Sequence, residues 1–318
     1  MSNLERAPRE VRRGGTAETP TGPVLDLVTG KKAPLGDGTD VRRVLPTLGR
    51  RMVGAWCFFD HYGPDDISAS PGMQVPPHPH TGLQTVSWLL EGTVHHRDSL
   101  GHDVVVGPGQ LGLMTAGHGI SHSEQSPVPH PALLHGTQLW VALPDSARDV
   151  TPAFEHHGDL PATTVDDAGV RVVLGSFGGV TSPGTTYSPM VGLDVTVAGR
   201  ATLPLEPDFE YAAVAVEAGL TVDGVDLPIG SLLHLGTGRR ALPVGGHGRL
   251  MLLGGEPFGE QIVMWWNLLG RSHEEIESFR EQWQAADRRF GTVPGWRDER
   301  TSAPPLPGGR LRARGAAG

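Results

Sequence analysis

The sequence predicts an all-β protein made of two tandem antiparallel β-barrels and one short helix. Three observations lead to this prediction. The 318 residues include 45 Gly and 28 Pro but only 19% charged residues, which favours short strands and turns over long helices. Apolar runs of strand length recur between Gly and Pro turns in both halves of the chain. One run with helical periodicity follows the second half.

Five strands are expected in the first half, where turns rich in Gly and Pro separate the apolar runs. They span residues 85–90, 94–98, 103–106, 111–115 and 133–143. A second series follows a connection with Pro and Asp between residues 145 and 165, and spans 170–174, 191–197, 211–216, 232–235 and 249–253. Short strands at such regular spacing predict one antiparallel barrel in each half.

A helix is expected after the second barrel. Ser272 and Glu275 have the spacing of a capping box, in which each side chain satisfies a free backbone N–H of the first turn. Apolar residues then recur at helical spacing before Gly291 ends the run: Ile276, Phe279, Trp283 and Phe290. This stripe predicts a helix that packs against a barrel.

The composition divides the chain into four parts. Residues 23–145 are expected to form the first barrel, and residues 146–300 the second barrel with its helix. Residues 1–22 and 301–318 are rich in Pro, Gly, Ala and Arg, and bury too little apolar surface to offset the entropy of ordering them. Both ends are therefore expected to be flexible tails.

Charge and hydropathy exclude several classes of protein. The net charge is −9 and Lys and Arg form no long block, so direct binding to nucleic acid is not expected. The most apolar run, residues 262–269, is far too short for a membrane span of roughly twenty residues. The first 23 residues lack the apolar core of a secretory signal, and a single cysteine, Cys57, forms no intrachain disulfide. We therefore expect a cytoplasmic protein without a membrane segment.

Histidine is the unusual feature of the composition, because nine of the fifteen His residues lie between His78 and His135. His78 and His80 are two residues apart and lead into a predicted strand, so their side chains share one face. His122 and Glu124 repeat this spacing 42 residues after His80. Two matched pairs that can meet inside one barrel predict a metal site rather than isolated histidines that satisfy local hydrogen bonds.

Three imidazoles and one carboxylate suit Fe(II), Mn(II), Ni(II), Cu(II) or Zn(II), and ligand chemistry alone does not choose among these metals. Four protein ligands leave two positions open on an octahedral ion. Open positions on a redox metal are what a reaction with dioxygen requires. The sequence therefore predicts one transition metal ion per chain, held in the first barrel.

Other residues of this region receive secondary roles. Gln84 shares the strand parity of His80, so its amide is expected to face the metal and to orient a substrate or a bound water. His118 lies in a glycine-rich loop before His122. It is a candidate hydrogen-bond donor to a metal ligand, or a residue that lines the pocket. His95 and His96 are adjacent and face opposite ways on a strand, so at most one of them can point inward, and surface exposure is expected. Cys57 is expected to be a small buried hydrophobe rather than a ligand.

Three stretches of the sequence resemble the pirin family of the cupin superfamily, over residues 24 to 291. They read HPHTGLQTVSWLLEG, HRDSLGHDVVVGPGQLGLMTAGHGISHSE and EQIVMWWN followed by SHEEIESF. The resemblance implies a bicupin, two barrels of the double-stranded β-helix type. It also implies iron in the first barrel, bound by residues that match the family motifs here: His78, His80, His122 and Glu124. Many pirins have Glu where this chain has Gln84, and the second barrel, with only His234 and His247, is expected to hold no metal.

The resemblance implies two alternative functions. One is an enzyme like quercetin 2,3-dioxygenase, in which Fe(II) and O2 open the ring of a small phenolic substrate such as a flavonol. Glu124 would then act as the catalytic base while remaining a ligand. The other is an iron-dependent regulatory protein that acts on transcription or metabolism through a protein partner. We favour the enzyme, and expect no contact with nucleic acid in either case.

Overall fold

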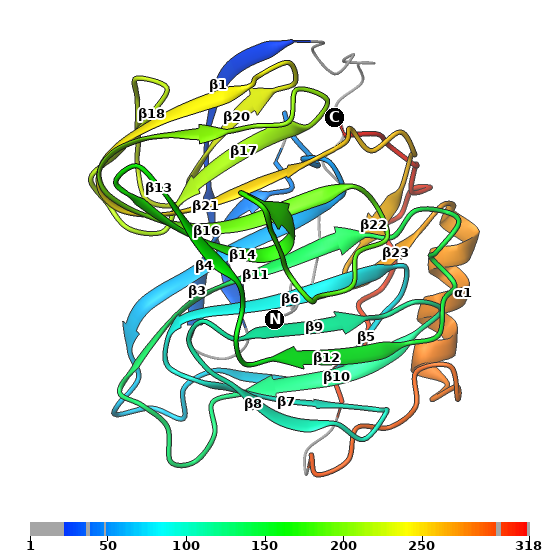
Figure 1. The fold of residues 1–318 in the computed structure, drawn as a ribbon. Coiled ribbons are helices and arrows are strands. Elements are labelled where there is room, and N and C mark those ends of the chain that lie inside the picture. The colour runs from blue at the N-terminus through cyan, green and yellow to red at the C-terminus, as the bar shows by residue number, and fades with distance from the viewer. Residues whose placement is uncertain (1–21, 36–38, 48, 297–299, 317–318) are drawn as a thin grey trace.

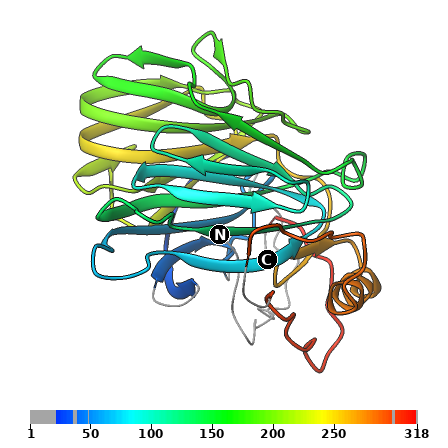
Figure 2. The same ribbon diagram turned by 90° about the horizontal axis from the view of Figure 1, so that it is seen from below.

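The computed structural model describes residues 22–35, 39–47, 49–296 and 300–316. These residues form two antiparallel β-barrels packed against each other, with the helix α1 (His273–Gln284) at the side of the first barrel (Figures 1 and 2). The predicted all-β class is confirmed, and so is the arrangement as two tandem barrels. Within the described ranges, no helix has the length and apolar character needed to span a membrane.

The first barrel consists of a seven-stranded sheet facing a four-stranded sheet. In pairing order, the larger sheet contains β12 (Ala153–His157), β9 (Leu111–Thr115), β6 (Leu83–Glu91), β11 (Leu133–Ala142), β4 (Trp56–Asp66), β3 (Thr39–Leu45) and β2 (Lys31–Leu35). The smaller sheet contains β5 (Gln74–His80), β10 (Ile120–Gln125), β7 (Val94–Asp98) and β8 (Asp103–Val106). All five strands expected in this half are present.

The second barrel is a single ten-stranded sheet around its own apolar core. Its main path contains β1 (Pro23–Thr29), β20 (Ser231–Gly236), β17 (Glu210–Ala215), β21 (Ala241–Gly255), β16 (Met190–Pro204), β14 (Ala168–Phe177) and β13 (Ala162–Val165). Three short strands extend this path: β15 (Val180–Thr181), β18 (Leu220–Val222) and β19 (Val225–Leu227). The five strands expected in this half lie within β14, β16, β17, β20 and β21 or overlap them closely.

The interface between the barrels is apolar and is built from alternate residues of facing strands. Val86 and Trp88 on β6 pack into a buried cluster that also contains Val214 and Met251 of the second barrel. The indole N–H of Trp88 donates to the Asp194 carboxylate across 3.1 Å. Because side chains alternate along a strand, the residues between them face the inside of the first barrel.

The sequence predicted a boundary between the barrels at residues 145 and 146, but the strands do not divide there. β1 pairs with β20 and so belongs to the sheet of the second barrel, although it precedes the whole first barrel. β12 pairs with β9 and extends the sheet of the first barrel beyond residue 145. In both cases a strand covers an edge whose backbone groups would otherwise lack partners, and sequence order does not reveal which edge that is.

Residues 263–296 begin with a hairpin of β22 (Val263–Trp265) and β23 (Leu268–Gly270), which reaches back to the first barrel, where Leu268 bridges to Thr81. The helix α1 follows, and the hydroxyl of Ser272 accepts the backbone N–H of Glu275 as predicted. The helix ends at Gln284 rather than continuing to Gly291, because the backbone turns through Ala286, which has a φ of 56°.

The expected C-terminal tail is not free in the structure. Leu311 and Ala303 are both 5% exposed and join the apolar cluster under α1. The backbone of the segment is also held, because Thr301 N–H donates to Pro77 O and Arg314 pairs with Ile262. The segment has too little apolar surface for a core of its own, but it fills a groove that other elements already form. Of the expected N-terminal tail, residues 1–21 lie outside the described residues.

Candidate metal centre

Three histidines face one another inside the first barrel. His78 and His80 are on β5, and His122 lies opposite His78 on the neighbouring strand β10. The ring centroids are 4.4 Å apart for His78 and His122, 5.0 Å for His78 and His80, and 5.1 Å for His80 and His122. All three rings are fully buried. The spacing of two residues on adjacent strands therefore places three imidazoles in one buried triangle.

The potential ligand atoms fall into two overlapping groups. One atom each from His78, His80 and His122 lie within 4.8 Å of one another, and so do one atom each from His96, His122 and Glu124. His122 is common to both groups. Two ligands of one ion lie at most about 4.2 Å apart when each metal–ligand bond is about 2.1 Å. Small movements of these side chains would therefore bring them to coordination distance.

The outer nitrogens of two rings have partners that fix their orientation. His78 Nδ1 lies 2.7 Å from Pro76 O, and His80 Nδ1 lies 3.0 Å from Asn267 O in the β22–β23 hairpin. A carbonyl only accepts, so in both rings Nδ1 carries the hydrogen and Nε2 carries the lone pair. Among the described residues, Nε2 of His80 and Nε2 of His122 are buried without a hydrogen-bond partner. Buried lone pairs of this kind fit a metal ion.

The protonation state of the imidazoles also fits a metal. Burial lowers the pKa of His78 to about 3, and burial together with neighbouring imidazoles lowers the pKa values of His80 and His122 well below the usual value. All three rings are therefore neutral at neutral pH. A metal binds only the neutral imidazole, so no proton must first be removed from this group.

Glu124 is held by a strand of the opposite sheet. Its Oε1 accepts a hydrogen bond of 2.8 Å from the Ser87 hydroxyl, and Ser87 Oγ also lies 3.0 Å from Gln138 Oε1. Glu124 is 1% exposed. The sequence reasoning missed Ser87 and Gln138. Their signal was a polar residue at an inward position of an otherwise apolar strand.

The predicted role of Gln84 is wrong in its geometry. Gly82, with a φ of 66°, interrupts the extended backbone between β5 and β6. The alternation of side chains along β5 therefore does not predict the face on which Gln84 lies. The Gln84 amide donates to Thr115 Oγ1 across 2.9 Å and to Thr185 O across 3.1 Å. It shares a face with Val86 and Trp88, which pack on the second barrel. Gln84 therefore belongs to the interface between the barrels.

His118 does not line the site either. Its side chain is exposed, and its backbone carbonyl accepts a hydrogen bond from Arg289. The neighbouring Gly117, with a φ of 50°, turns the loop so that this residue faces outward. The spacing of four residues before His122 was misleading, because the intervening chain is a turn and not a helix or a strand.

Of the adjacent pair His95 and His96, His96 is the one that points inward, although surface exposure was expected. It is 3% exposed, and its Nδ1 lies 3.4 Å from Nδ1 of His122. His96 and Asp98 on β7 have the same spacing of two residues that identified the other pairs, and they contact each other. The sequence did not reveal this pair, because His95 and His96 are adjacent and either one could have pointed inward. The structure thus adds His96 to the surroundings of the predicted ligands.

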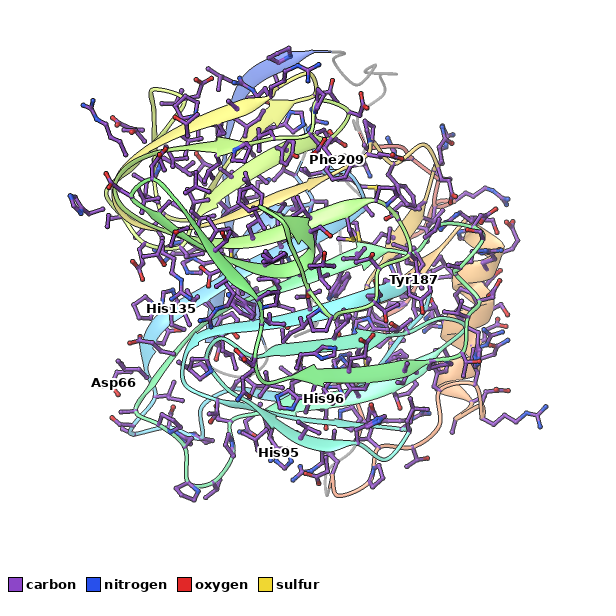
Figure 3. The ribbon with its side chains drawn as sticks, viewed as in Figure 1. Asp66, His95, His96, His135, Tyr187 and Phe209 are labelled. Atoms are coloured by element: carbon purple, nitrogen blue, oxygen red, sulfur yellow. The ribbon has the colours of Figure 1, made fainter. Side chains whose placement is uncertain are left out.

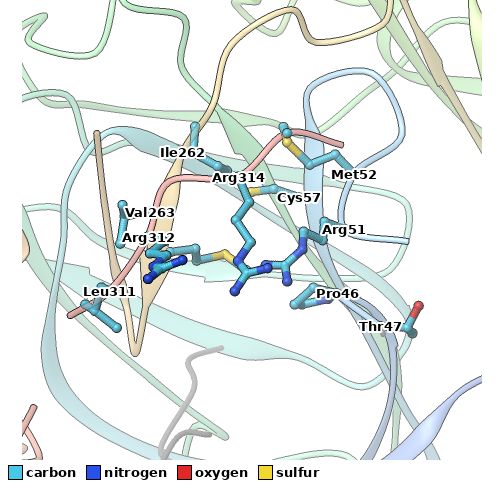
Figure 4. A pocket seen from close by; sticks show the side chains of 12 residues that line it. Pro46, Thr47, Arg51, Met52, Cys57, Ile262, Val263, Leu311, Arg312 and Arg314 are labelled. Atoms are coloured by element: carbon cyan, nitrogen blue, oxygen red, sulfur yellow. The ribbon is translucent and has the colours of Figure 1, made fainter. Parts of the chain in front are cut away.

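A cavity of about 110 Å³ lies between the segment leading into β4 and the C-terminal segment, and Arg51, Arg312 and Arg314 line it (Figure 4). Cys57 lies in its wall. Burial raises the pKa of the Cys57 thiol to about 12, so this residue is not a thiolate at neutral pH. Cys57 belongs to neither group of potential ligands found among the described residues.

In the second barrel, His234 is fully buried and its Nε2 lies 3.1 Å from the Glu210 carboxylate, whereas His247 is exposed. Among the described residues, both groups of potential metal ligands lie in the first barrel.

Known proteins are similar to this chain over most of its length. A Pseudomonas aeruginosa protein named "Putative quercetin 2,3-dioxygenase PA1205" is 44% identical over 288 residues, which are 89% of this chain and 91% of the relative. The crystal structure of quercetin 2,3-dioxygenase from Acinetobacter baumannii has a TM-score of 0.88 and 41% identity, and the match covers 91% of this chain and 97% of that one.

The fold extends to more distant proteins. The Escherichia coli bacterial pirin YhhW in complex with nickel(II) has a TM-score of 0.57 and 20% identity, over 74% of this chain and all of that one. Two family models match the two barrels, Pirin over residues 38–141 and the Pirin C-terminal cupin domain over residues 190–291. The chain therefore belongs to the pirin family.

Proposed function

We propose that this pirin is a metal-dependent dioxygenase that opens the ring of a flavonol-like phenol with O2. Four residues would hold the metal: His78, His80, His122 and Glu124. The observation that carries the proposal is the triangle of buried, neutral imidazoles, two of which present an Nε2 without a hydrogen-bond partner among the described residues. The quercetin 2,3-dioxygenases named among the relatives support the choice of substrate class.

Fe(II) is the metal we propose, with Mn, Ni, Cu and Zn as alternatives. Three imidazoles and one carboxylate suit each of these ions. The nickel(II) complex of YhhW supports a divalent transition metal in this fold. When bound, the metal would act as a Lewis acid toward a phenolate oxygen and would supply the redox chemistry for O2.

The residues of the chain would supply orientation, a base and the exclusion of water. Glu124 would take the proton of the substrate hydroxyl at a carboxylate oxygen, while the Ser87 hydroxyl holds Oε1 in place. The hydrogen bonds to Pro76 O and Asn267 O would keep two imidazoles in the orientation that ligation needs. The Trp140 ring lies 5.2 Å from that of His80 and gives the centre an apolar wall.

The test combines metal content with oxygen consumption. The protein is loaded with Fe(II) under anaerobic conditions, and its iron content is measured by atomic absorption. Oxygen uptake is then followed with quercetin and with a panel of enolisable phenols. We expect about one iron per chain and turnover of at least one flavonol. The variants His80→Ala and His122→Ala should lose the metal and the activity, while the exposed His118→Ala should keep both.

Two results would count against the proposal. Equal iron content in wild type and both ligand variants would exclude this centre as the metal site. Full iron loading without oxygen uptake on any phenol would leave the metal centre standing and would contradict the enzyme. That second result is the one expected of an iron-dependent regulator acting through a protein partner.

A further inference from the structure

We propose that His96 and Asp98 form a positioning pair, which fixes the tautomer and the ring orientation of His122. The inference rests on the metal centre proposed above and adds two residues to it. Neither is a ligand in this arrangement. Both act through His122, the residue that the two groups of potential ligands share.

The hydrogen-bond chain has one consistent direction. Asp98 is ionised at neutral pH and only accepts, so His96 Nε2, 3.3 Å from Asp98 Oδ2, must carry a hydrogen. In the neutral ring of His96, the other nitrogen, Nδ1, is then an acceptor. Nδ1 of His122 lies 3.4 Å from it and therefore donates. The remaining nitrogen of His122, Nε2, keeps its lone pair and is the buried atom that lacks a hydrogen-bond partner among the described residues.

Asp98 is itself fixed by the backbone. Its Oδ1 accepts the N–H groups of Leu100 and His102, across 2.9 and 3.1 Å. Its Oδ2 is also 2.8 Å from Nδ1 of the half-exposed His102. Asp98 is fully buried. The turn after β7 therefore holds the carboxylate in the one place from which it can direct the hydrogen of His96.

The ring of His96 is held by packing as well. It stacks on Phe154 of β12, with centroids 4.0 Å apart and an angle of 5° between the planes. The neighbouring His95 lies beside it on β7 but turns to the other face (Figure 3). There His95 contacts Asp103. A stacked ring with a fixed tautomer is a rigid acceptor for His122.

The comparison with the other two imidazoles supports a positioning role. His78 and His80 each direct Nδ1 to a backbone carbonyl, which no substitution removes. His122 has a side-chain pair in the equivalent place. In the centre built on His78, His80 and His122, the ion would face His122 Nε2, whereas His96 Nδ1 faces the opposite nitrogen of that ring.

The test uses three variants and a metal without redox complications. Co(II) affinity is measured by competition with a chelator, and the visible spectrum of bound Co(II) reports the ligand geometry. His96→Phe keeps the stacked ring and removes the acceptor, so affinity should fall about 10- to 100-fold with a changed spectrum. His96→Asn places an amide oxygen near the position of Nδ1 and should recover most of the affinity. His95→Phe, the matched control, should bind as wild type does.

The outcomes separate this inference from the proposed function. Failure of the wild type to bind Co(II) would contradict the metal centre itself. Wild-type affinity and spectrum in His96→Phe would overturn the positioning role, and so would complete loss of metal equal to that of His122→Ala, which would make His96 a ligand. If His96→Phe does not fold, Asp98→Asn serves instead. This variant should also weaken binding, because an amide can donate to His96 Nε2 and reverse the tautomer.

Discussion

Ser87 donates a hydrogen bond of 2.8 Å to Oε1 of Glu124 and thereby joins the two sheets of the first barrel. Ser87 is on β6 in the larger sheet, and Glu124 is on β10 in the smaller one. The carboxylate is therefore oriented from across the barrel, whereas two of the imidazoles are oriented by backbone carbonyls. The Ser87 hydroxyl therefore contributes to the orientation of Glu124.

Ser87→Ala should weaken metal binding by about tenfold, because the carboxylate loses a donor that helps to orient it. Ser121→Ala is the matched control. Ser121 lies beside His122 but donates to Phe290 O across 2.8 Å, away from the centre. It should cost about 1 kcal/mol of unfolding free energy and leave metal affinity unchanged. Chelator competition and urea unfolding measure the two quantities, and equal metal affinity in wild type and Ser87→Ala would contradict the role of Ser87.

Gln84→Glu should destabilise the protein by roughly 2 to 4 kcal/mol at neutral pH without changing metal affinity. The amide is fully buried and donates to Thr115 and Thr185, and a carboxylate could donate to neither. Gln84→Leu, which removes the same hydrogen bonds without adding a charge, should cost less. Thermal unfolding and metal titration check this, and tighter metal binding in Gln84→Glu would place residue 84 at the metal after all.

Acid should destabilise the metal-free protein, and His61 should account for part of this effect. Burial first, and then His135 and Arg42, lower the pKa of His61 to about 3, below the value of about 6.5 in an unfolded chain. Between these values the unfolded state binds more protons, so the free energy of unfolding falls as pH falls from 6.5 toward 3.

In the structure, Nε2 of His61 lies 2.9 Å from Nε2 of His135. The variant His61→Gln keeps a polar side chain near His135, but the new side chain does not titrate. Its unfolding free energy should fall less than that of wild type between pH 7.5 and pH 5.5, by about 1.4 kcal/mol. Urea unfolding at the two pH values measures this difference. The exposed His118→Gln should behave as wild type does, and an unchanged pH dependence in His61→Gln would show that folding does not lower the pKa of His61.

Leu311→Ala should lower the unfolding free energy by about 2 to 3 kcal/mol, because the side chain fills part of the cluster under α1. Arg310, the preceding residue, is 67% exposed, so Arg310→Ala should change stability by less than about 0.5 kcal/mol. Denaturant unfolding compares the two variants. A neutral Leu311→Ala would mean that residues 300–316 do not pack in solution.

Local sequence patterns predicted the strands well. Apolar runs and the Gly and Pro residues of turns determine the bounds of a strand within a few positions of the chain. β7, β8 and β9 have the predicted bounds, and the cap of α1 is formed by the predicted residue, Ser272. The pairs His78 with His80 and His122 with Glu124 were found for the same reason, since a spacing of two residues fixes a shared face within one strand.

Two kinds of feature were predicted wrongly: side-chain directions beyond a turn in the backbone, and contacts with segments far away in the sequence. The parity argument for Gln84 failed at Gly82, whose positive φ separates two strands of different sheets. The placement of Pro23–Thr29 in the second sheet depends on pairing with Ser231–Gly236, which no local pattern contains. The sequence predicted a solvated Leu311, because the groove that buries this side chain is formed by other segments of the chain.

The contact of His80 with Asn267 O spans 187 positions of the chain and sets an order of events during synthesis. At about 5 to 20 residues per second, a ribosome needs about 10 to 40 s to travel from one residue to the other. Throughout that interval the imidazole of His80 lacks the carbonyl that directs its Nδ1–H. Until the β22–β23 hairpin has been synthesised, a metal ion would therefore meet a His80 ring whose orientation is not yet fixed.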